Sequence, residues 1–143
     1  MKPVSTLYRL ASTAADYRAC HAIMRANQNF HDLQLHWPTV VAERNGKILG
    51  FMSTNKCDWC LLAGPLETST HNPIMVMRLA EAYEAALRVA GITRYCFAIK
   101  RSQKRWLEQV SSLDMTTEVA GDKNEAIFEK ILPGDPLVTR IAA

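Results

Sequence analysis

The residues between positions 60 and 91 join a short apolar strand to a long helix through a polar loop. Asn72 and Pro73 are residue types typical of a helix cap and of the first helical position, and Gly91 is typical of a helix end. The first turn of a helix carries N–H groups that lack a partner within the helix, and the positive end of the helix dipole. Such a strand–loop–helix junction can bind an anion, for example a phosphate group.

Cys57 and Cys60 form a Cys-x-x-Cys motif, a spacing found in zinc sites and in redox pairs. A structural zinc ion takes four ligands, and the only further pair with workable spacing is the distant Cys20–His21. Redox pairs usually lie at a helix N-terminus, whereas this motif lies on a predicted turn that leads into a strand. We therefore expect no metal site, and reduced thiols at all four cysteines, Cys96 included, rather than a disulfide framework. The role of the Cys57/Cys60 pair stays open.

Four positive charges fall within six residues, at Lys100, Arg101, Lys104 and Arg105. We expect them near the start of a helix over residues 100–111, an end at which the helix dipole disfavours cations. They form either a solvated face or a contact with an anionic partner, such as a cofactor phosphate, nucleic acid or an acidic protein surface. The run has only one neighbouring tryptophan and lacks the interleaved aromatic residues of single-strand binders, so a nucleic-acid partner is not expected.

The chain of 143 residues has the length of one domain and can bury a full core without metal or disulfide. Its 48% hydrophobic and 22% charged residues argue against disorder, and its net charge of +3 is too small to indicate nucleic-acid binding by itself. No apolar run approaches the roughly 18 residues of a membrane span, and the N-terminus has no secretory apolar core. We expect a cytoplasmic protein with a single domain over residues 1–132 and a C-terminal tail over 133–143.

Hydrophobic periodicity and turn residues predict helices and strands in mixed order. Asn45-Gly46 accepts the positive φ angles of a two-residue hairpin turn. Thr13 and Asp16 resemble a capping box, and Gly64-Pro65 suggests a bulge or an edge that has lost pairing. The expected strands cover residues 7–10, 39–44, 47–54, 60–66, 92–99, 115–119 and 126–132, and the expected helices cover 13–27, 73–90 and 100–111. Between Asn27 and Pro38 a short helix and an irregular connection are both open.

This order predicts an α/β (α+β) fold with a mixed central sheet, an antiparallel meander and flanking helices. With VVAERNGKILGFM as second and third strands, it resembles the GNAT superfamily of acyl-CoA-dependent N-acyltransferases over residues 7–132. Members bind the pantetheine arm by strand pairing at a splay after the fourth strand. They hold the pyrophosphate on loop amides, in the pattern Gln or Arg, two residues, Gly, one residue, Gly or Ala. The resemblance implies acetyl-CoA or a related thioester as cofactor and a primary amine as acceptor.

Laid without gaps on LETSTHNPIMVMRL, the family pattern assigns cofactor contacts to six positions: Leu66, Thr68, His71, Val76, Met77 and Arg78. His71 stands where members carry Gln or Arg, and it offers a hydrogen-bonding group near a phosphate; otherwise it is a solvated histidine. Ile74 and Val76 stand at the two glycine positions, where a β-branched side chain obstructs the approach of backbone to phosphate. Pro73 also removes one N–H from the loop.

Glu67 lies at the strand end where several members place a general base that acts on the substrate amine. Such a base needs hydrogen-bond reach to the proton that it removes, and the other interpretation of Glu67 is an exposed loop carboxylate. Members often carry a tyrosine on the last helix as general acid for the departing thiolate. Leu107 stands near that position, so the resemblance supplies no acid.

Two functions follow from these residues. The first is an N-acyltransferase that uses acetyl-CoA on a primary amine, with Glu67 as base. The second is a catalytically silent GNAT-like protein that binds no cofactor and contacts a protein partner or a larger assembly. Glycine-free GNAT-like domains similar to this one occur among the internal virion proteins of some short-tailed bacteriophages, so the second function implies a virion-associated component. The apolar residues Met75 and Met77 suit either a buried loop or such an interface.

Overall fold

The computed structural model describes residues 5–28 and 33–133. The chain forms two compact units: unit 1 comprises residues 1–55 and 64–86, and unit 2 comprises 56–63 and 87–143. Nearly all of the expected C-terminal tail, residues 134–143, lies outside the described residues, so the boundary of the domain at residue 132 stays a prediction.

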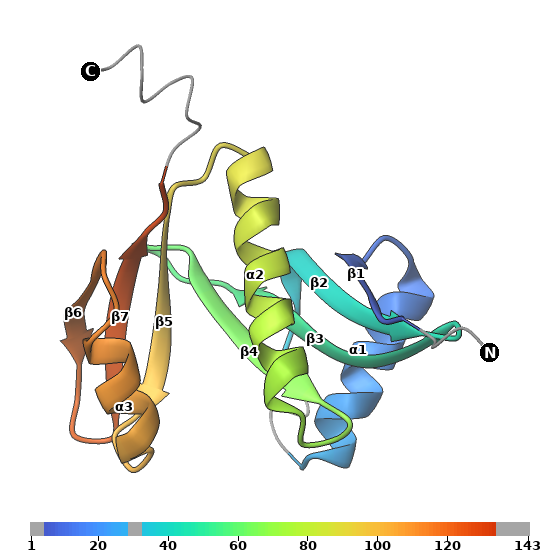
Figure 1. The fold of residues 1–143 in the computed structure, drawn as a ribbon, viewed down its shortest axis with the longest axis horizontal. Coiled ribbons are helices and arrows are strands. Elements are labelled where there is room, and N and C mark those ends of the chain that lie inside the picture. The colour runs from blue at the N-terminus through green and yellow to red at the C-terminus, as the bar shows by residue number, and fades with distance from the viewer. Residues whose placement is uncertain (1–4, 29–32, 134–143) are drawn as a thin grey trace. The chain divides into compact units, whose positions relative to one another are not determined.

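The described residues form seven strands and three helices in a mixed arrangement (Figure 1). In chain order these elements are β1 (Leu7–Leu10), α1 (Ala14–Ala26), β2 (His36–Arg44), β3 (Lys47–Asn55), β4 (Leu62–Thr68), α2 (Pro73–Val89), β5 (Arg94–Lys100), α3 (Lys104–Ser111), β6 (Thr116–Gly121) and β7 (Glu125–Ile131). The strands form one sheet in the order β1-β2-β3-β4-β5-β7-β6. The predicted α/β class, with its antiparallel meander and mixed sheet, is confirmed.

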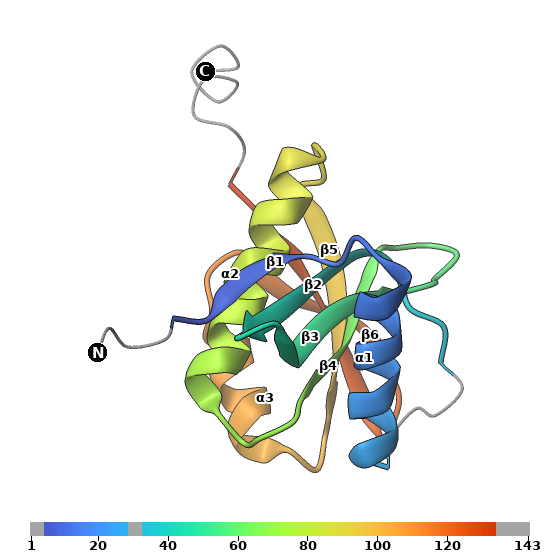
Figure 2. The same ribbon diagram turned by 90° about the vertical axis from the view of Figure 1, so that its right-hand side faces the viewer.

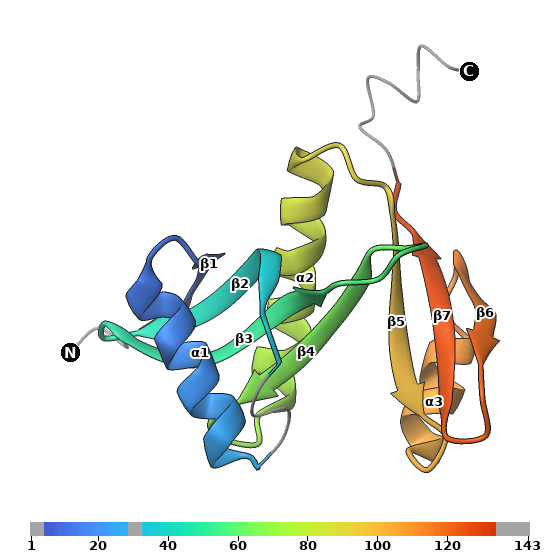
Figure 3. The ribbon, with the colours of Figure 1, turned by 180° about the vertical axis from the view of Figure 1, so that it is seen from behind.

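Local sequence signals place the elements of unit 1. Asn45 and Gly46 have φ angles of 53° and 74°, as the predicted two-residue hairpin turn between β2 and β3 requires. The predicted capping box also forms, because Thr13 Oγ1 accepts a hydrogen bond from the N–H of Asp16 and the Asp16 carboxylate accepts one from the N–H of Thr13. Helices α1 and α2 cover opposite faces of the β2–β3–β4 region (Figures 2 and 3).

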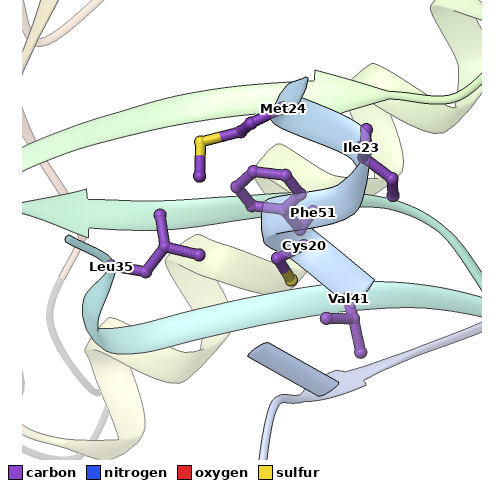
Figure 4. Packing of buried hydrophobic residues seen from close by; sticks show 6 residues of the cluster. All are labelled: Cys20, Ile23, Met24, Leu35, Val41 and Phe51. Carbon is purple, nitrogen blue, oxygen red and sulfur yellow. The ribbon is translucent and has the colours of Figure 1, made fainter. Parts of the chain in front are cut away.

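Side chains that alternate along β2 and β3 supply a core to each helix. On the α1 side, one cluster consists of Cys20, Ile23, Met24, Leu35, Val41 and Phe51 (Figure 4). On the α2 side, the buried Tyr83 hydroxyl hydrogen-bonds the Thr54 hydroxyl at 2.7 Å. Because Val41 and Phe51 are register partners, as are Val40 and Met52, a slip of one residue would exchange the two faces.

Unit 2 contains β5, β6, β7 and α3. Val110 of α3 packs with Ala126 and Phe128 of β7, and Phe97 of β5 stacks on Phe128 at a centroid distance of 5.8 Å. Leu62 and Ala63, at the start of β4, pair in parallel with Cys96 and Phe97 of β5. This parallel pairing confirms the predicted strand–helix–strand connection through α2.

Several element boundaries differ from the sequence-based expectation by a few residues, among them those of β2, β4 and α3. The fourth strand begins at Leu62 rather than residue 60 and continues to Thr68, because the N–H of Ser69 still bonds the Leu49 carbonyl of β3 at 2.7 Å. The last helix begins at Lys104 rather than residue 100, because Lys100 ends β5. In the segment left open, β2 already starts at His36, while residues 29–32 lie outside the described residues. Over the described range, no helix has the length and apolarity needed to cross a membrane.

Candidate functional site

Glu67 lies inside β4, one residue before its end, and it is half-buried. The side-chain amide of Asn27 donates one hydrogen bond to Oε2 of Glu67 at 2.7 Å and another to the Thr68 carbonyl at 3.1 Å. An amide nitrogen carries two hydrogens, so both bonds can form together. Asn27 is the cap residue at the C-terminus of α1, and it therefore fixes the Glu67 carboxylate from a second element. The expectation of a strand-end carboxylate is confirmed, whereas Glu67 is not an exposed loop residue.

Gly50 of β3 lets the backbone of β4 approach closely at this position. A Cβ atom added to Gly50 would lie 2.9 Å from Cγ2 of Thr68 and 3.1 Å from the carbonyl oxygen of Glu67. Contacts this short are rare for real side chains, so only glycine fits here without a shift of the Thr68 side chain or the β4 backbone. Gly50 and Asn27 together determine where Glu67 lies.

The N-terminus of α2 has its backbone groups already occupied. Oδ1 of Asn72 accepts hydrogen bonds from the N–H groups of Ile74 at 3.1 Å and Met75 at 3.2 Å. The Asn72 carbonyl accepts the Val76 N–H at 3.2 Å, and Pro73 has no N–H. The predicted cap and the predicted proline at the first helical position are both confirmed. As a result, the first four positions of α2 leave no N–H group for an anion.

This occupancy bears directly on coenzyme A. In the family that the sequence resembles, backbone N–H groups at this junction hold the pyrophosphate, whereas here those of residues 73–76 are missing or bonded to Asn72. The residues present at the start of α2 therefore do not fit a pyrophosphate in this conformation. Sequence reasoning attributed the obstacle to the missing glycines and to the N–H that Pro73 lacks, and the structure adds a further obstacle, the Asn72 side chain.

The proposed cofactor residues fall into two groups. Leu66 and Thr68 are half-buried and flank Glu67 on β4, and Oγ1 of Thr68 donates to the Thr70 carbonyl at 2.6 Å. The others lie on the loop and on the first turns of α2: His71, Met77 and Arg78 are exposed and Val76 is half-buried. Arg78 forms an exposed ion pair with Glu81 at 3.0 Å. The structure thus brings Leu66, Glu67 and Thr68 together.

The apolar first turn of α2 divides between the core and the surface. Met75 is buried, with 4% of its surface exposed, while Ile74 and Met77 are 64% and 53% exposed. The sequence allowed either a buried turn or an exposed apolar surface. Met75 follows the first expectation, and Ile74 and Met77 follow the second. These two residues are three positions apart, so they lie on one face of the helix.

A groove with a volume of about 510 Å³ runs along α1 from Asp16 to Asn27 and is also lined by Lys47 and Ser69. At its Asp16 end, Arg9 bonds the Asp16 carboxylate at 2.8 and 2.9 Å and Glu43 at 2.6 Å. The Arg9 hydrogen bonds hold the pKa of Asp16 well below its usual range, helped by the N–H of Ser12. In this network one guanidinium group pairs with two carboxylates. Asn27 belongs both to the groove wall and to the Glu67 contact.

The predicted basic cluster divides into Arg101, which is bonded within the chain, and three exposed residues, Lys100 among them. Arg101 donates to the Asp122 carbonyl at 2.6 Å and pairs with Glu118 at 3.0 Å, so it ties the β5–α3 turn to the β6–β7 loop. Lys104 and Arg105 are exposed on the first turn of α3. Within residues 5–28 and 33–133, no three His, Cys, Asp or Glu side chains gather as metal ligands would.

Asn27 is the site residue that sequence reasoning missed. It is 40 residues from Glu67, and no local motif connects the two. One signal was present: Asn27 is the polar member of the α1 face that carries Tyr17, Cys20, Ile23 and Met24. A half-buried amide on an otherwise apolar face favours a hydrogen-bond partner, which indicates a contact with another element.

Comparison of the chain with protein-family models and with curated protein sequences finds no match. Comparison with solved structures finds three informative similarities. N-acetylglutamate synthase from Neisseria gonorrhoeae, complexed with coenzyme A and N-acetyl-glutamate, matches at a TM-score of 0.63 and 14% identity; 92% of this chain is covered, but it spans only 36% of that longer chain. The ribosomal-protein-S18-alanine N-acetyltransferase from Escherichia coli matches at a TM-score of 0.66 and 13% sequence identity. The match covers 92% of this chain and 97% of that one. An acyl-CoA N-acyltransferase from Pseudomonas aeruginosa matches at a TM-score of 0.64 and 13% sequence identity. The match covers 90% of this chain and 99% of that one.

Proposed function

We propose that this chain, whose fold is that of the GNAT superfamily, is an N-acyltransferase that transfers an acyl group from a thioester to a primary amine. The observation that carries the proposal is the Asn27–Glu67 hydrogen bond of 2.7 Å at the end of β4. A carboxylate held by a neutral amide donor keeps one oxygen free to accept a proton. This is the arrangement that a general base requires.

In the proposed reaction Glu67 accepts a proton from the substrate ammonium group. The neutral amine nitrogen then forms a bond to the thioester carbonyl carbon, and the carbon–sulfur bond breaks. As the carbon–sulfur bond breaks, the nitrogen loses a second proton, and the leaving thiolate takes up one proton. The products are an amide and a thiol, and Glu67 returns its proton to solvent. Asn27 is a positioning residue in this scheme, because it contacts Glu67 and not the reacting atoms. Gly50 is also a positioning residue, because it allows the β4 backbone that carries Glu67 to lie close to β3.

The donor we propose is acetyl-CoA or a related acyl thioester. Neighbouring structures support this class, since one is complexed with coenzyme A and another is an acyl-CoA N-acyltransferase. Leu66 and Thr68, beside Glu67, are the residues we expect along the pantetheine arm. His71, Val76, Met77 and Arg78 would lie toward the phosphates. Because the N–H groups of α2 do not fit the pyrophosphate, no step of the proposal depends on phosphate binding there.

The acceptor we propose is a primary amine on an amino acid or a protein N-terminus. N-acetyl-glutamate is bound in one neighbour, and another acts on the alanine of a ribosomal protein. The second function raised by the sequence, a silent scaffold or virion component, receives no support from these comparisons. It remains the outcome to which a negative experiment would lead.

The test is to incubate the purified protein with acetyl-CoA and a panel of amino acids and alanine-terminated peptides, and to measure acetylated product by mass spectrometry. The expected result is product with the wild type and a loss of about a hundredfold in rate with Glu67→Gln, the low end of the effect of a general base. Glu108→Gln, an exposed carboxylate on α3, is the matched control and should keep full activity. Absence of product with every amine, together with no thermal stabilisation by millimolar acetyl-CoA, would refute the proposal.

A further inference from the structure

Three of the four thiols gather in unit 2. Cys57 and Cys60 lie in the segment before β4, and the Cys60 thiol donates a hydrogen bond to the Cys57 sulfur across 3.6 Å. Cys96 lies on β5, where its N–H bonds the Leu61 carbonyl at 2.8 Å, and its thiol helps to raise the pKa of Cys60. The sequence interpretation looked to Cys20 for a partner, but Cys20 is buried in the core of unit 1. All four cysteines are free thiols.

The surroundings of the three sulfurs differ in a way that distinguishes their reactivity. The Cys57 sulfur accepts hydrogen bonds from the Trp59 N–H and from Cys60, which lower the pKa of Cys57. Burial raises the pKa of Cys60 to about 12 and also raises the pKa of Cys96. Since the thiolate is the nucleophile, Cys57 is the member of the cluster prepared to attack an electrophile.

We propose that Cys57 and Cys60 form a reversible dithiol–disulfide site that a hydroperoxide oxidises, with Cys57 as the attacking thiol and Cys60 as the resolving thiol. This modification site assigns a chemistry to the Cys-x-x-Cys motif, and it does not depend on the acyltransferase proposal. The structure supports it through the short sulfur–sulfur separation and through the position of both residues outside the helices and strands.

The reaction balances in two steps. In the first, written for hydrogen peroxide, the Cys57 thiolate attacks one peroxide oxygen, the O–O bond breaks, and the products are a sulfenic acid and hydroxide, which is protonated to water. In the second, the Cys60 sulfur attacks the Cys57 sulfur, the S–O bond breaks, and the hydroxyl group leaves as water with the Cys60 proton. The two thiols lose two electrons and two protons in total, and the peroxide is reduced to two waters.

The geometry favours a disulfide between Cys57 and Cys60 over one between Cys60 and Cys96. To form the bond, the two sulfurs must approach from 3.6 Å to about 2.05 Å. Cys57 and Cys60 lie in a segment without helix or strand structure, in which Trp59 is 59% exposed, so a small adjustment of that segment suffices. Cys96, in contrast, is held in β5 by Leu62 of β4 and Glu129 of β7, and it is buried.

The experiment treats the purified full chain with hydrogen peroxide, blocks remaining thiols with N-ethylmaleimide, and maps tryptic peptides by mass spectrometry. Cys57 and Cys60 share the peptide of residues 57–78, whereas Cys96 is on 95–100 and Cys20 on 19–25. The expected product is the 57–78 peptide with two hydrogens fewer and no maleimide, which dithiothreitol restores to the dithiol. A cross-linked pair of the 57–78 and 95–100 peptides, or no change in 57–78 when peroxide is in excess, would overturn the proposal.

Single serine variants separate the roles. In Cys60→Ser, a sulfenic acid on Cys57 should accumulate and be captured by dimedone, whereas Cys57→Ser should give no adduct at Cys60. Cys20→Ser and Cys96→Ser are the controls and should form the disulfide as the wild type does, with circular dichroism confirming that each variant is folded. Unchanged peroxide reactivity of the 57–78 peptide in Cys57→Ser would also contradict the assignment.

Discussion

The Asn27 side chain, at the C-terminal end of α1, donates a hydrogen bond of 2.7 Å to Oε2 of Glu67 near the end of β4. The same amide nitrogen bonds the next backbone carbonyl, that of Thr68, at 3.1 Å. One side chain thus holds both the carboxylate and the strand that carries it. This contact places Glu67 in a fixed direction and makes it the candidate base of the site.

Removal of the Asn27 amide should reduce catalysis without loss of substrate binding. A hydrogen bond to a charged group contributes about 1.5–3 kcal/mol, so Asn27→Ala should lower kcat by about tenfold to a hundredfold. The KM values for amine and thioester should change little, because Asn27 contacts neither in the proposed scheme. Steady-state kinetics measure this separation of kcat from KM. Arg25→Ala changes an exposed residue on the last turn of the same helix and is the control. A rise in KM with unchanged kcat in Asn27→Ala would argue against a positioning role.

Gly50→Ala should displace the β4 end. The added methyl group would lie 3.1 Å from the Glu67 carbonyl oxygen and 2.9 Å from Thr68 Cγ2, so the strand or its neighbours must shift. We expect a loss of kcat of at least tenfold, since small displacements of catalytic groups have large effects on rate. Urea denaturation measures the accompanying loss of stability, about 1–3 kcal/mol for an overpacked site. Gly46→Ala, at a glycine with open space around it, controls for general destabilisation, although its φ of 74° will cost some stability. Activity equal to wild type in Gly50→Ala would contradict the role of this close approach.

Asn72→Ala should lower stability and strengthen binding of coenzyme A. Loss of the cap costs about 1 kcal/mol, and it frees the N–H groups of Ile74 and Met75 that Asn72 now occupies. Thermal unfolding and isothermal titration calorimetry with coenzyme A measure the two opposite effects. Asn72→Asp keeps a capping oxygen and should show no gain in affinity.

Val76→Gly separates the two obstacles at the α2 N-terminus. It removes the β-branched side chain but leaves the Asn72 cap, and as a helix glycine it should cost about 1 kcal/mol. If the cap is the main obstacle, Val76→Gly alone should bind coenzyme A no better than wild type, and the double variant with Asn72→Ala should bind best. A full gain from Val76→Gly alone would show that the missing glycine is the main obstacle.

The Arg9–Asp16 contact predicts a loss of stability in acid. Because the pKa of Asp16 is lower in the folded chain than its unfolded value of about 3.9, the unfolded state takes up the proton first. The contribution of Asp16 is therefore complete above about pH 4 and is lost as the pH falls below it. Urea denaturation from pH 7 to pH 2 measures this loss. Asp16→Asn should lower the free energy of unfolding by roughly 3 kcal/mol at pH 7, because it leaves Arg9 without this partner. The variant should also lose less stability than the wild type as the pH falls below 4. An equal loss of stability in acid would contradict the assignment.

Local signals in the sequence were sufficient for most of the fold. Thr13 and Asp16 form the predicted capping box, Asn45-Gly46 forms the predicted turn, and Asn72-Pro73 starts α2. Each depends on the backbone preferences of a few neighbouring residues. The boundaries of β4 and α3 were wrong because hydrogen bonds to other elements decide them, such as that of Ser69 to Leu49.

The chemistry of the site divides in the same way. The sequence by itself determined that Glu67 lies near a strand end, that Asn72 caps a helix and that two cysteines are three positions apart, because these are properties of adjacent residues. Only the tertiary structure decided that Asn27 holds Glu67 and that Gly50 allows the β4 backbone to approach closely. These contacts join residues that are distant along the chain. Their geometry follows from how the strands pair and the helices pack, which no local pattern in the sequence encodes.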